Sequence, residues 1–229
     1  LPLDPALATL GQPLTVPKDM VLLHGGSTAL IVDARGGRVW AVDAARLVGF
    51  NPASEPTVAK IPGVKAVVGF DGVAHLLTPD GKVRRISGGM GSWVVTDDKA
   101  LTDFADNPSV TLTAIGDQIV AVDTVKRIVW SSSGRRTLGP GEAVVVQQPS
   151  APSTTLALAS ANALLQVPLG DGEPATRPIP AAGAPTAPVV VAGCTYAAWS
   201  GSGDFVRECP GTTDDVGTTS PKLAAAKDV

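Results

Sequence analysis

Residues 39–43, with the sequence Val-Trp-Ala-Val-Asp, have a close counterpart eighty positions later, where residues 119–123 read Ile-Val-Ala-Val-Asp. Fainter copies of the same apolar pattern lie near residues 76, 164 and 196. A unit of about 40 residues that contains several short strands has the length of one β-propeller blade. The recurrence therefore predicts a propeller-like architecture, although it does not define a reaction.

The apolar runs between these copies extend the same rhythm along most of the chain. The first strands of successive repeats are expected near residues 29, 66, 112, 156 and 188, and each repeat reads as three short strands separated by turns. We therefore expect an all-β, β-propeller-like protein with about five blade-like units of three to four antiparallel strands. A jelly roll and a two-sheet sandwich are the competing folds, but neither predicts the recurring Ala-Val-Asp. Helix should be scarce.

Three hairpins follow directly from this pattern. We expect strand pairs between residues 29–33 and 39–43, between 66–70 and 73–78, and between 111–115 and 118–123. In the second pair, Asp71-Gly72 lies between two apolar runs, which is a strong hairpin signal because glycine accepts a positive φ. We predict a two-residue reverse turn there, with positive φ at Gly72.

Proline and small polar residues mark the expected domain boundaries. Residues 1–27 form a proline-punctuated lead-in, residues 28–210 the propeller domain, and residues 211–229 a polar exit tail or linker. The two boundaries rest on composition and on the first and last recognisable strands.

Composition limits the classes of partner. Apolar residues make up 44% of the chain and aromatic residues only 4%, so Val, Ala, Leu and Ile must fill the core. The net charge is −3 and no basic stripe is present, which argues against nucleic acid as a partner because phosphate binding needs clustered cations. No run approaches the roughly 18 apolar residues of a membrane-spanning helix, so we expect no direct membrane insertion by this chain.

Cys194 and Cys209 are the only cysteines, and their spacing is symmetric about a loop. Two strand-like runs lie between them and flank the Ser-Gly-Ser-Gly sequence at residues 200–203. A hairpin with this loop places the two cysteines opposite each other. If Trp199 and Asp204 form its closing hydrogen-bonded pair, the cysteines occupy a non-hydrogen-bonded pair, where Cβ atoms come closest.

Such a position suits a disulfide, and we predict one between Cys194 and Cys209. Disulfides persist in oxidising compartments, so the prediction favours an extracytoplasmic protein. The alternative is a pair of buried thiols in a cytosolic protein.

No catalytic, cofactor-binding or metal-binding residues are predicted. His24 and His75 are the only histidines, and no further ligand accompanies them at a metal-binding spacing. Most aspartates fall at turns, where the side chain bonds the neighbouring backbone. Asp43 and Asp123 end the two copies of the repeat, which is what a structural role predicts. Trp40 is placed on a second strand, and so is Trp199, and both are expected to pack between blades.

The hairpin motif Gly193-Cys194-x-Tyr196-x-x-Trp199, followed by Val206-Arg207-x-Cys209, resembles the propeller-like ectodomain of large actinobacterial exported proteins. The resemblance covers most of residues 20–210. It implies a parent protein with an N-terminal membrane anchor and with immunoglobulin-like or fibronectin type III modules after the propeller. It also implies that this chain is a fragment, with no catalytic residues to assign.

The expected function is that of a non-enzymatic extracytoplasmic module that binds a protein or a cell-envelope polysaccharide. Propellers bind ligands through loops at one face or at the central opening. The loops of interest are residues 51–56, 88–92 and 149–152. Two alternatives stay open: a carbohydrate-active lyase or glycosidase, which needs converging carboxylates, and a purely structural spacer.

Overall fold

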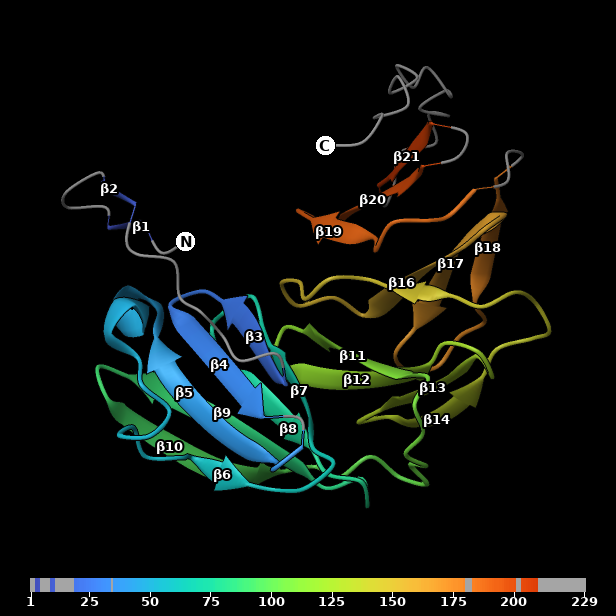
Figure 1. Ribbon diagram of the computed structural model, residues 1–229. Coiled ribbons are helices and arrows are strands. Elements are labelled where there is room, and N and C mark those ends of the chain that lie inside the picture. The colour runs from blue at the N-terminus through green and yellow to red at the C-terminus, as the bar shows by residue number, and fades with distance from the viewer. Residues whose placement is uncertain are drawn as a thin grey trace. The chain divides into compact units, whose positions relative to one another are not determined.

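The computed structural model describes residues 3–4, 9–10, 19–33, 35–179, 183–200 and 203–209 (Figure 1). The chain divides into two compact units, Leu1–Asp106 and Asn107–Val229. A small antiparallel pair, β1 (Leu3–Asp4) with β2 (Thr9–Leu10), precedes the larger sheets of the first unit.

The first unit contains two four-stranded antiparallel sheets, each built from strands that are consecutive in sequence. The first sheet comprises β3 (Met20–Gly25), β4 (Thr28–Asp33), β5 (Arg38–Asp43) and β6 (Ala59–Lys60). The second sheet comprises β7 (Lys65–Val68), β8 (Ala74–Leu77), β9 (Val83–Gly89) and β10 (Ser92–Asp98). A short 3-10 helix, η1 (Ala44–Gly49), follows β5, with the Asp43 carboxylate accepting the Ala45 N–H at its start.

The second unit continues the pattern with two four-stranded sheets and one three-stranded sheet. The third sheet comprises β11 (Val110–Ile115), β12 (Gln118–Asp123), β13 (Ile128–Ser131) and β14 (Gly134–Thr137). The fourth comprises β15 (Val145–Val146), β16 (Thr155–Ser160), β17 (Ala163–Pro168) and β18 (Ala175–Pro178). The fifth comprises β19 (Val189–Val191), β20 (Cys194–Trp199) and β21 (Asp204–Glu208).

These five consecutive up-and-down sheets confirm the predicted all-β, β-propeller-like fold class. A jelly roll would pair strands that are distant in sequence, whereas neighbours within each of these sheets are consecutive strands. The three predicted hairpins are also confirmed, as the pairs β4–β5, β7–β8 and β11–β12.

The apolar core lies between successive sheets within each unit. In the first unit, Leu30 and Val39 of the first sheet pack with Leu76 and Ile86 of the second. In the second unit, one cluster joins the third and fourth sheets, and another joins the fourth and fifth. Side chains alternate across each strand, so a central sheet can bury both faces. Small and medium aliphatic residues fill these layers, as the low aromatic content requires.

The aspartates that recur from one repeat to the next are not the pair that the sequence suggested. Asp43 ends β5, the third strand of its sheet, whereas Asp123 ends β12, a second strand. The residue equivalent to Asp123 is Asp33, at the end of β4: each of these two carboxylates accepts the backbone N–H groups two and three residues later. The equivalence of Asp43 with Asp123 was therefore wrong, because residues 39–43 and 119–123 resemble each other only as apolar strands.

The positions of two tryptophans agree with the alignment of Asp33 with Asp123. In both repeats the Asp is followed seven positions later by a buried tryptophan on the next strand, Trp40 on β5 and Trp130 on β13. Trp40 is thus on a third strand, and it packs with Ala29, Ile31 and Leu47 of its own sheet and η1 rather than between sheets. The predicted placement is confirmed for Trp199, which lies on β20 within the cluster that joins the fourth and fifth sheets.

Several strands lie outside the expected repeats. β3 falls within the predicted lead-in of residues 1–27, and it pairs with β4 along its full length. The outer strands β6, β10, β14 and β15 were not part of the predicted strand pattern. The boundaries at residues 27 and 210 stay a prediction, and most of the predicted exit tail lies outside the described residues.

The turn at Asp71-Gly72 has the predicted positive φ, +83° at Gly72, but its loop contains three residues. Val68 pairs with Ala74, and the Gly69 N–H donates to the Val73 carbonyl oxygen at 2.7 Å. The predicted two-residue loop was therefore wrong. A three-residue loop, with a type I turn followed by a left-handed glycine, is the next common hairpin connection.

Replacing Gly72 with valine should lower the free energy of unfolding by about 1 kcal/mol or more, because a β-branched residue resists a positive φ. A Cβ at this position would also lie 3.2 Å from the Thr28 hydroxyl oxygen and 3.3 Å from the Gly25 carbonyl oxygen. Urea unfolding of Gly72→Val against the unchanged protein measures the effect. An identical unfolding midpoint would reject this account of the turn.

Candidate functional site

The first unit contains a cleft of about 660 Å³ at the outer edge of its first sheet. One side is formed by residues 40–43 of β5 and by Ala45 and Arg46 of η1. The other sides are formed by residues 55–58 and by Gly91, Trp93 and Val95. Two of the three loops predicted to bind a ligand contribute to this cleft, residues 51–56 through Glu55 and Pro56 and residues 88–92 through Gly91.

The third predicted loop, residues 149–152, is held by structural contacts in the second unit. The backbone N–H of Ser150 donates to the Ala114 carbonyl, and the Gly116 N–H donates to the Ser150 carbonyl. Pro152 lies so close to Gly116 that a Cβ there would be 2.8 Å from the proline ring. These contacts fasten the loop to the end of β11.

Trp40 and Trp93 have different roles in the cleft. Trp40 is almost completely buried, and its indole Nε1 donates to the Glu55 carbonyl oxygen at 3.2 Å. This bond fixes the wall formed by residues 55–58. Trp93 is only half-buried: it packs on the core between the two sheets and also lines the cleft. It can therefore offer apolar ring surface to a ligand.

Two exposed charges of opposite sign stand at the walls of the cleft. They are Arg46 on η1 and Glu55 in the following loop, and no ion pair is formed by either within the described part of the chain. The Arg46 guanidinium reaches across to the turn before β10, 3.4 Å from where a Cβ of residue 91 would stand. The lining of the cleft therefore combines apolar ring surface with one cation, Arg46, and two carboxylates, those of Asp43 and Glu55.

Trp93 and Arg46 were not predicted from the sequence. The signal for Trp93 was present, because the run Ser-Trp-Val-Val-Thr at residues 92–96 is rich in strand-forming residues. Its alternation places Trp93 and Val95 on one face.

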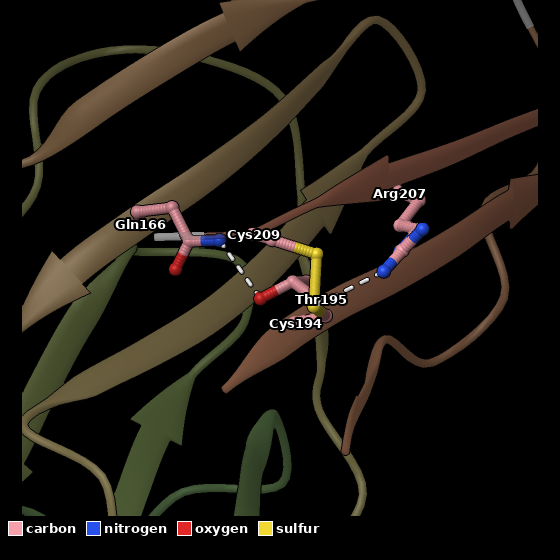
Figure 2. The surroundings of a disulfide bond; sticks show 5 residues. All are labelled: Gln166, Cys194, Thr195, Arg207 and Cys209. Atoms are coloured by element: carbon pink, nitrogen blue, oxygen red, sulfur yellow. Dashed lines mark hydrogen bonds between the residues drawn. A yellow bond between two sulfur atoms is a disulfide. The ribbon is translucent and has the colours of Figure 1, made fainter. Parts of the chain in front are cut away.

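The predicted cysteine pair lies in the fifth sheet of the second unit. Cys194 and Cys209 form a disulfide with a Cα–Cα distance of 4.1 Å, close to the 4.5 Å or so of a non-hydrogen-bonded pair. Trp199 pairs with Asp204, as the symmetry argument required. Figure 2 shows the Arg207 guanidinium directed at the bond, with its nitrogen 3.8 Å from the Cys194 Sγ.

A smaller hollow of about 290 Å³ borders this disulfide. Its lining includes the polar side chains of Gln166 of β17 and Thr195 of β20. The Gln166 Nε2 donates to the Thr195 Oγ1 at 2.9 Å, which links the fourth and fifth sheets (Figure 2). The disulfide closes the last hairpin on itself, and the Gln166–Thr195 bond connects that hairpin to the fourth sheet.

Histidines and acidic residues do not gather into a reactive cluster. His24 is exposed on β3, whereas His75 is buried on β8. In the described ranges, no group of three or more His, Cys, Asp or Glu side chains is placed to hold a metal ion. Within the same ranges, no helix is long and apolar enough to cross a membrane.

Three aspartates have lowered pKa values for structural reasons. The Gly36 N–H, the Arg38 side chain and the Arg35 N–H lower the pKa of Asp33. Burial would raise the pKa of Asp123, but hydrogen bonds from the Lys126 N–H, the Ser109 hydroxyl, the Asn107 amide and the Val125 N–H outweigh it. Hydrogen bonds from Lys82 and Thr78 lower the pKa of Asp80 to about 2.

These carboxylates should make the fold acid-sensitive. Because their pKa values are lower in the folded state than the ordinary 3.8, the unfolded chain binds more protons in acid. Their stabilising contribution is complete above about pH 5 and is lost as the pH falls towards the folded value, which is about 2 for Asp80. Urea midpoints measured between pH 5 and pH 2 should fall steadily. Asp80→Asn should flatten part of that decline, and a profile identical to that of the unchanged protein would contradict the assignment.

Comparison with known proteins finds similarity to solved structures only. No family model matches it, and no curated protein matches it. Among solved structures, PorZ, an essential surface component of the type-IX secretion system of Porphyromonas gingivalis, shows 16% identity with a TM-score of 0.41. That match covers 79% of this chain and 23% of the PorZ chain.

Two further structures have similar scores. A chain of the nidogen–laminin complex shows 12% identity and a TM-score of 0.43, over 83% of this chain and 76% of that one. The dihydro-heme d1 dehydrogenase NirN shows 13% identity and a TM-score of 0.40, over 90% of this chain and 52% of that one. The chain thus spans less than a quarter of PorZ and about half of NirN.

Proposed function

We propose that this chain is an extracytoplasmic, non-enzymatic binding domain that holds a partner protein or a cell-envelope polysaccharide in the cleft of its first unit. The observation that carries the proposal is that Glu55 and Pro56 of the loop 51–56 and Gly91 of the loop 88–92 line one cleft. Its volume of about 660 Å³ lies within the usual size range of ligand-binding pockets.

The chemistry of the cleft supports binding. Ligand sites combine apolar and aromatic surface with a few polar groups that fix orientation. Here Trp93 supplies ring surface, Arg46 supplies a positive charge, and Asp43 and Glu55 supply negative charges. The proposed location rests on the disulfide, since such bonds persist in oxidising compartments. The domain, residues 28–210 in this proposal, would belong to an anchored parent protein of the kind that the cysteine hairpin resembles.

The test is capture of envelope material by the immobilised domain. Envelope fractions of the source organism are treated with protease or with periodate, which cleaves the vicinal diols of sugars. Loss of capture after protease identifies a protein ligand, and loss after periodate identifies a polysaccharide. Trp93→Ala and Arg46→Ala should each weaken capture about tenfold. Val94→Ala is the matched control, because Val94 is the next residue of β10 and its side chain is exposed.

Capture that is unchanged in both cleft variants would reject the cleft as the site. Arg46 is exposed, so Arg46→Ala leaves the core intact. It therefore still tests the cleft if Trp93→Ala destabilises the first unit. Release of reducing sugar ends during incubation would overturn the non-enzymatic part of the proposal and favour a glycosidase.

A further inference from the structure

The first sheet has an unusually short outer strand. β6 pairs with only two residues of β5, Arg38 and Val39. In the second sheet, by contrast, the outer strand β10 pairs with β9 over seven residues. Among the described residues, no strand covers the edge of β5 along residues 40–43, and this same stretch lines the cleft.

Hydrogen bonds at both ends of β5 show which of its backbone N–H and C=O groups face β4 and which face the β6 side. The Gly37 and Val39 carbonyls accept from the Ile61 and Val58 N–H groups on the β6 side, at 2.8 Å each. Alternation along the strand places the N–H and C=O of residues 41 and 43 on that side too.

The opposite side of β5 follows the complementary pattern. The Ala44 N–H donates to Ser27, on the β4 side, which agrees with even-numbered residues facing β4. Among the described residues, no turn or loop backbone hydrogen bond reaches Ala41. The backbone groups of Ala41 thus face the cleft.

The walls of the cleft leave this edge open while limiting what can reach it. Trp40 is bonded through its indole to the Glu55 carbonyl, which fixes residues 55–58 as one wall. Trp93 and Val95 provide an apolar wall from β10. A ligand in the cleft therefore meets a strand edge and an apolar wall.

We infer that an extended peptide segment binds in this cleft as an added strand, antiparallel or parallel to β5, and completes the outer edge of the first sheet. Successive amides of a strand offer donors and acceptors at the spacing that the edge of β5 requires, which sugar hydroxyls do not. Side chains at alternate positions would face Trp93 and Val95, so apolar residues are expected there. The inference rests on the proposed function and selects a polypeptide ligand for it.

The probe is a display library of short random peptides, selected on the immobilised domain. Selected peptides should carry apolar residues at alternate positions. N-methylation of the two amides that face β5 should weaken binding about tenfold or more, since each backbone hydrogen bond contributes roughly 0.5–1.5 kcal/mol, or about 2- to 12-fold. N-methylation of the intervening amides is the matched control and should have little effect.

A protein variant tests the complementary hydrogen bond, which the Ala41 N–H would donate to a carbonyl of the peptide. Ala41→Pro removes the outward N–H while leaving the β4 ladder intact, because proline is tolerated where its missing N–H faces away from the sheet. It should weaken peptide binding about tenfold relative to Ala41→Ser, which keeps the N–H. If Ala41→Pro does not fold, the N-methylated peptides test the inference with the unchanged protein.

Failure of the inference can be told apart from failure of the proposed function. If no peptide is selected, or if N-methylation at every position is without effect, strand addition is wrong. The proposed function would still stand if envelope polysaccharide is captured in a manner that depends on Trp93 and Arg46. If neither peptide nor polysaccharide binds in this manner, both fail.

Discussion

Replacing Trp199 with alanine should lower the free energy of unfolding by about 3–5 kcal/mol, as is typical for a large aromatic residue removed from a core. Trp199 is fully buried and packs with Ala159, Leu164 and Val206 in the cluster between the fourth and fifth sheets. Its indole Nε1 also donates to the Ser160 carbonyl oxygen at 2.8 Å. The substitution therefore removes both apolar contact and the buried bond that ties β20 to β16.

Trp199→Phe separates these two contributions. Phenylalanine keeps much of the apolar volume but leaves the Ser160 carbonyl without its donor, so we expect a loss of about 1–3 kcal/mol. Urea unfolding followed by far-ultraviolet circular dichroism measures both variants. A loss below about 1 kcal/mol for Trp199→Ala would show that the fifth sheet contributes little to the core of the second unit.

Removing the disulfide is expected to have the next largest effect. The bond closes a loop with a sequence separation of 15, and the double variant Cys194→Ser with Cys209→Ser should lose about 2–4 kcal/mol. The fifth sheet has few large side chains, chiefly Tyr196, Trp199 and Phe205, so its packing compensates little. In the chain-entropy account, most of the loss arises because the unfolded chain gains freedom.

Two measurements test this prediction. Thiol titration of the denatured, unreduced protein should find no free thiol, and two reactive thiols per chain would contradict the bond. Reductant should lower the stability of the unchanged protein to that of the double variant, while leaving the double variant itself unaffected. A reductant effect that persists in the double variant would point to a cause other than this bond.

Local patterns predicted the parts of the structure that depend on local chemistry. The cysteine hairpin could be placed because its two strands are symmetric about a Ser-Gly loop, and the observed pairing of Trp199 with Asp204 follows that symmetry. Gly72 was correctly assigned a positive φ, because turn glycines report backbone conformation directly. The length of the loop around Gly72 was predicted incorrectly, because two- and three-residue hairpin loops both accept an Asp-Gly sequence.

Features that depend on neighbouring strands were harder to predict. Residues 39–43 and 119–123 look alike because both are buried apolar strands, although one is third and the other second in its sheet. The side-chain hydrogen bonds of Asp33 and Asp123, which mark the true repeat, are not visible in an apolar pattern. The cleft depends on how far β6 extends along β5, and no local signal in residues 51–60 determines that length.

The disulfide also determines which pairing of the last two strands can exist. A slip of β21 along β20 by one residue would turn the buried Val206 to solvent and bring Phe205, 38% exposed, into the core. The sulfur–sulfur bond between opposite residues makes that slipped arrangement inaccessible. β21 is an edge strand, and edge strands are prone to mispairing and to pairing with other chains. When the hydrogen bonds of this hairpin open, the covalent link therefore keeps the two strands in the same alignment for re-pairing. It thereby opposes mispairing and aggregation through this edge.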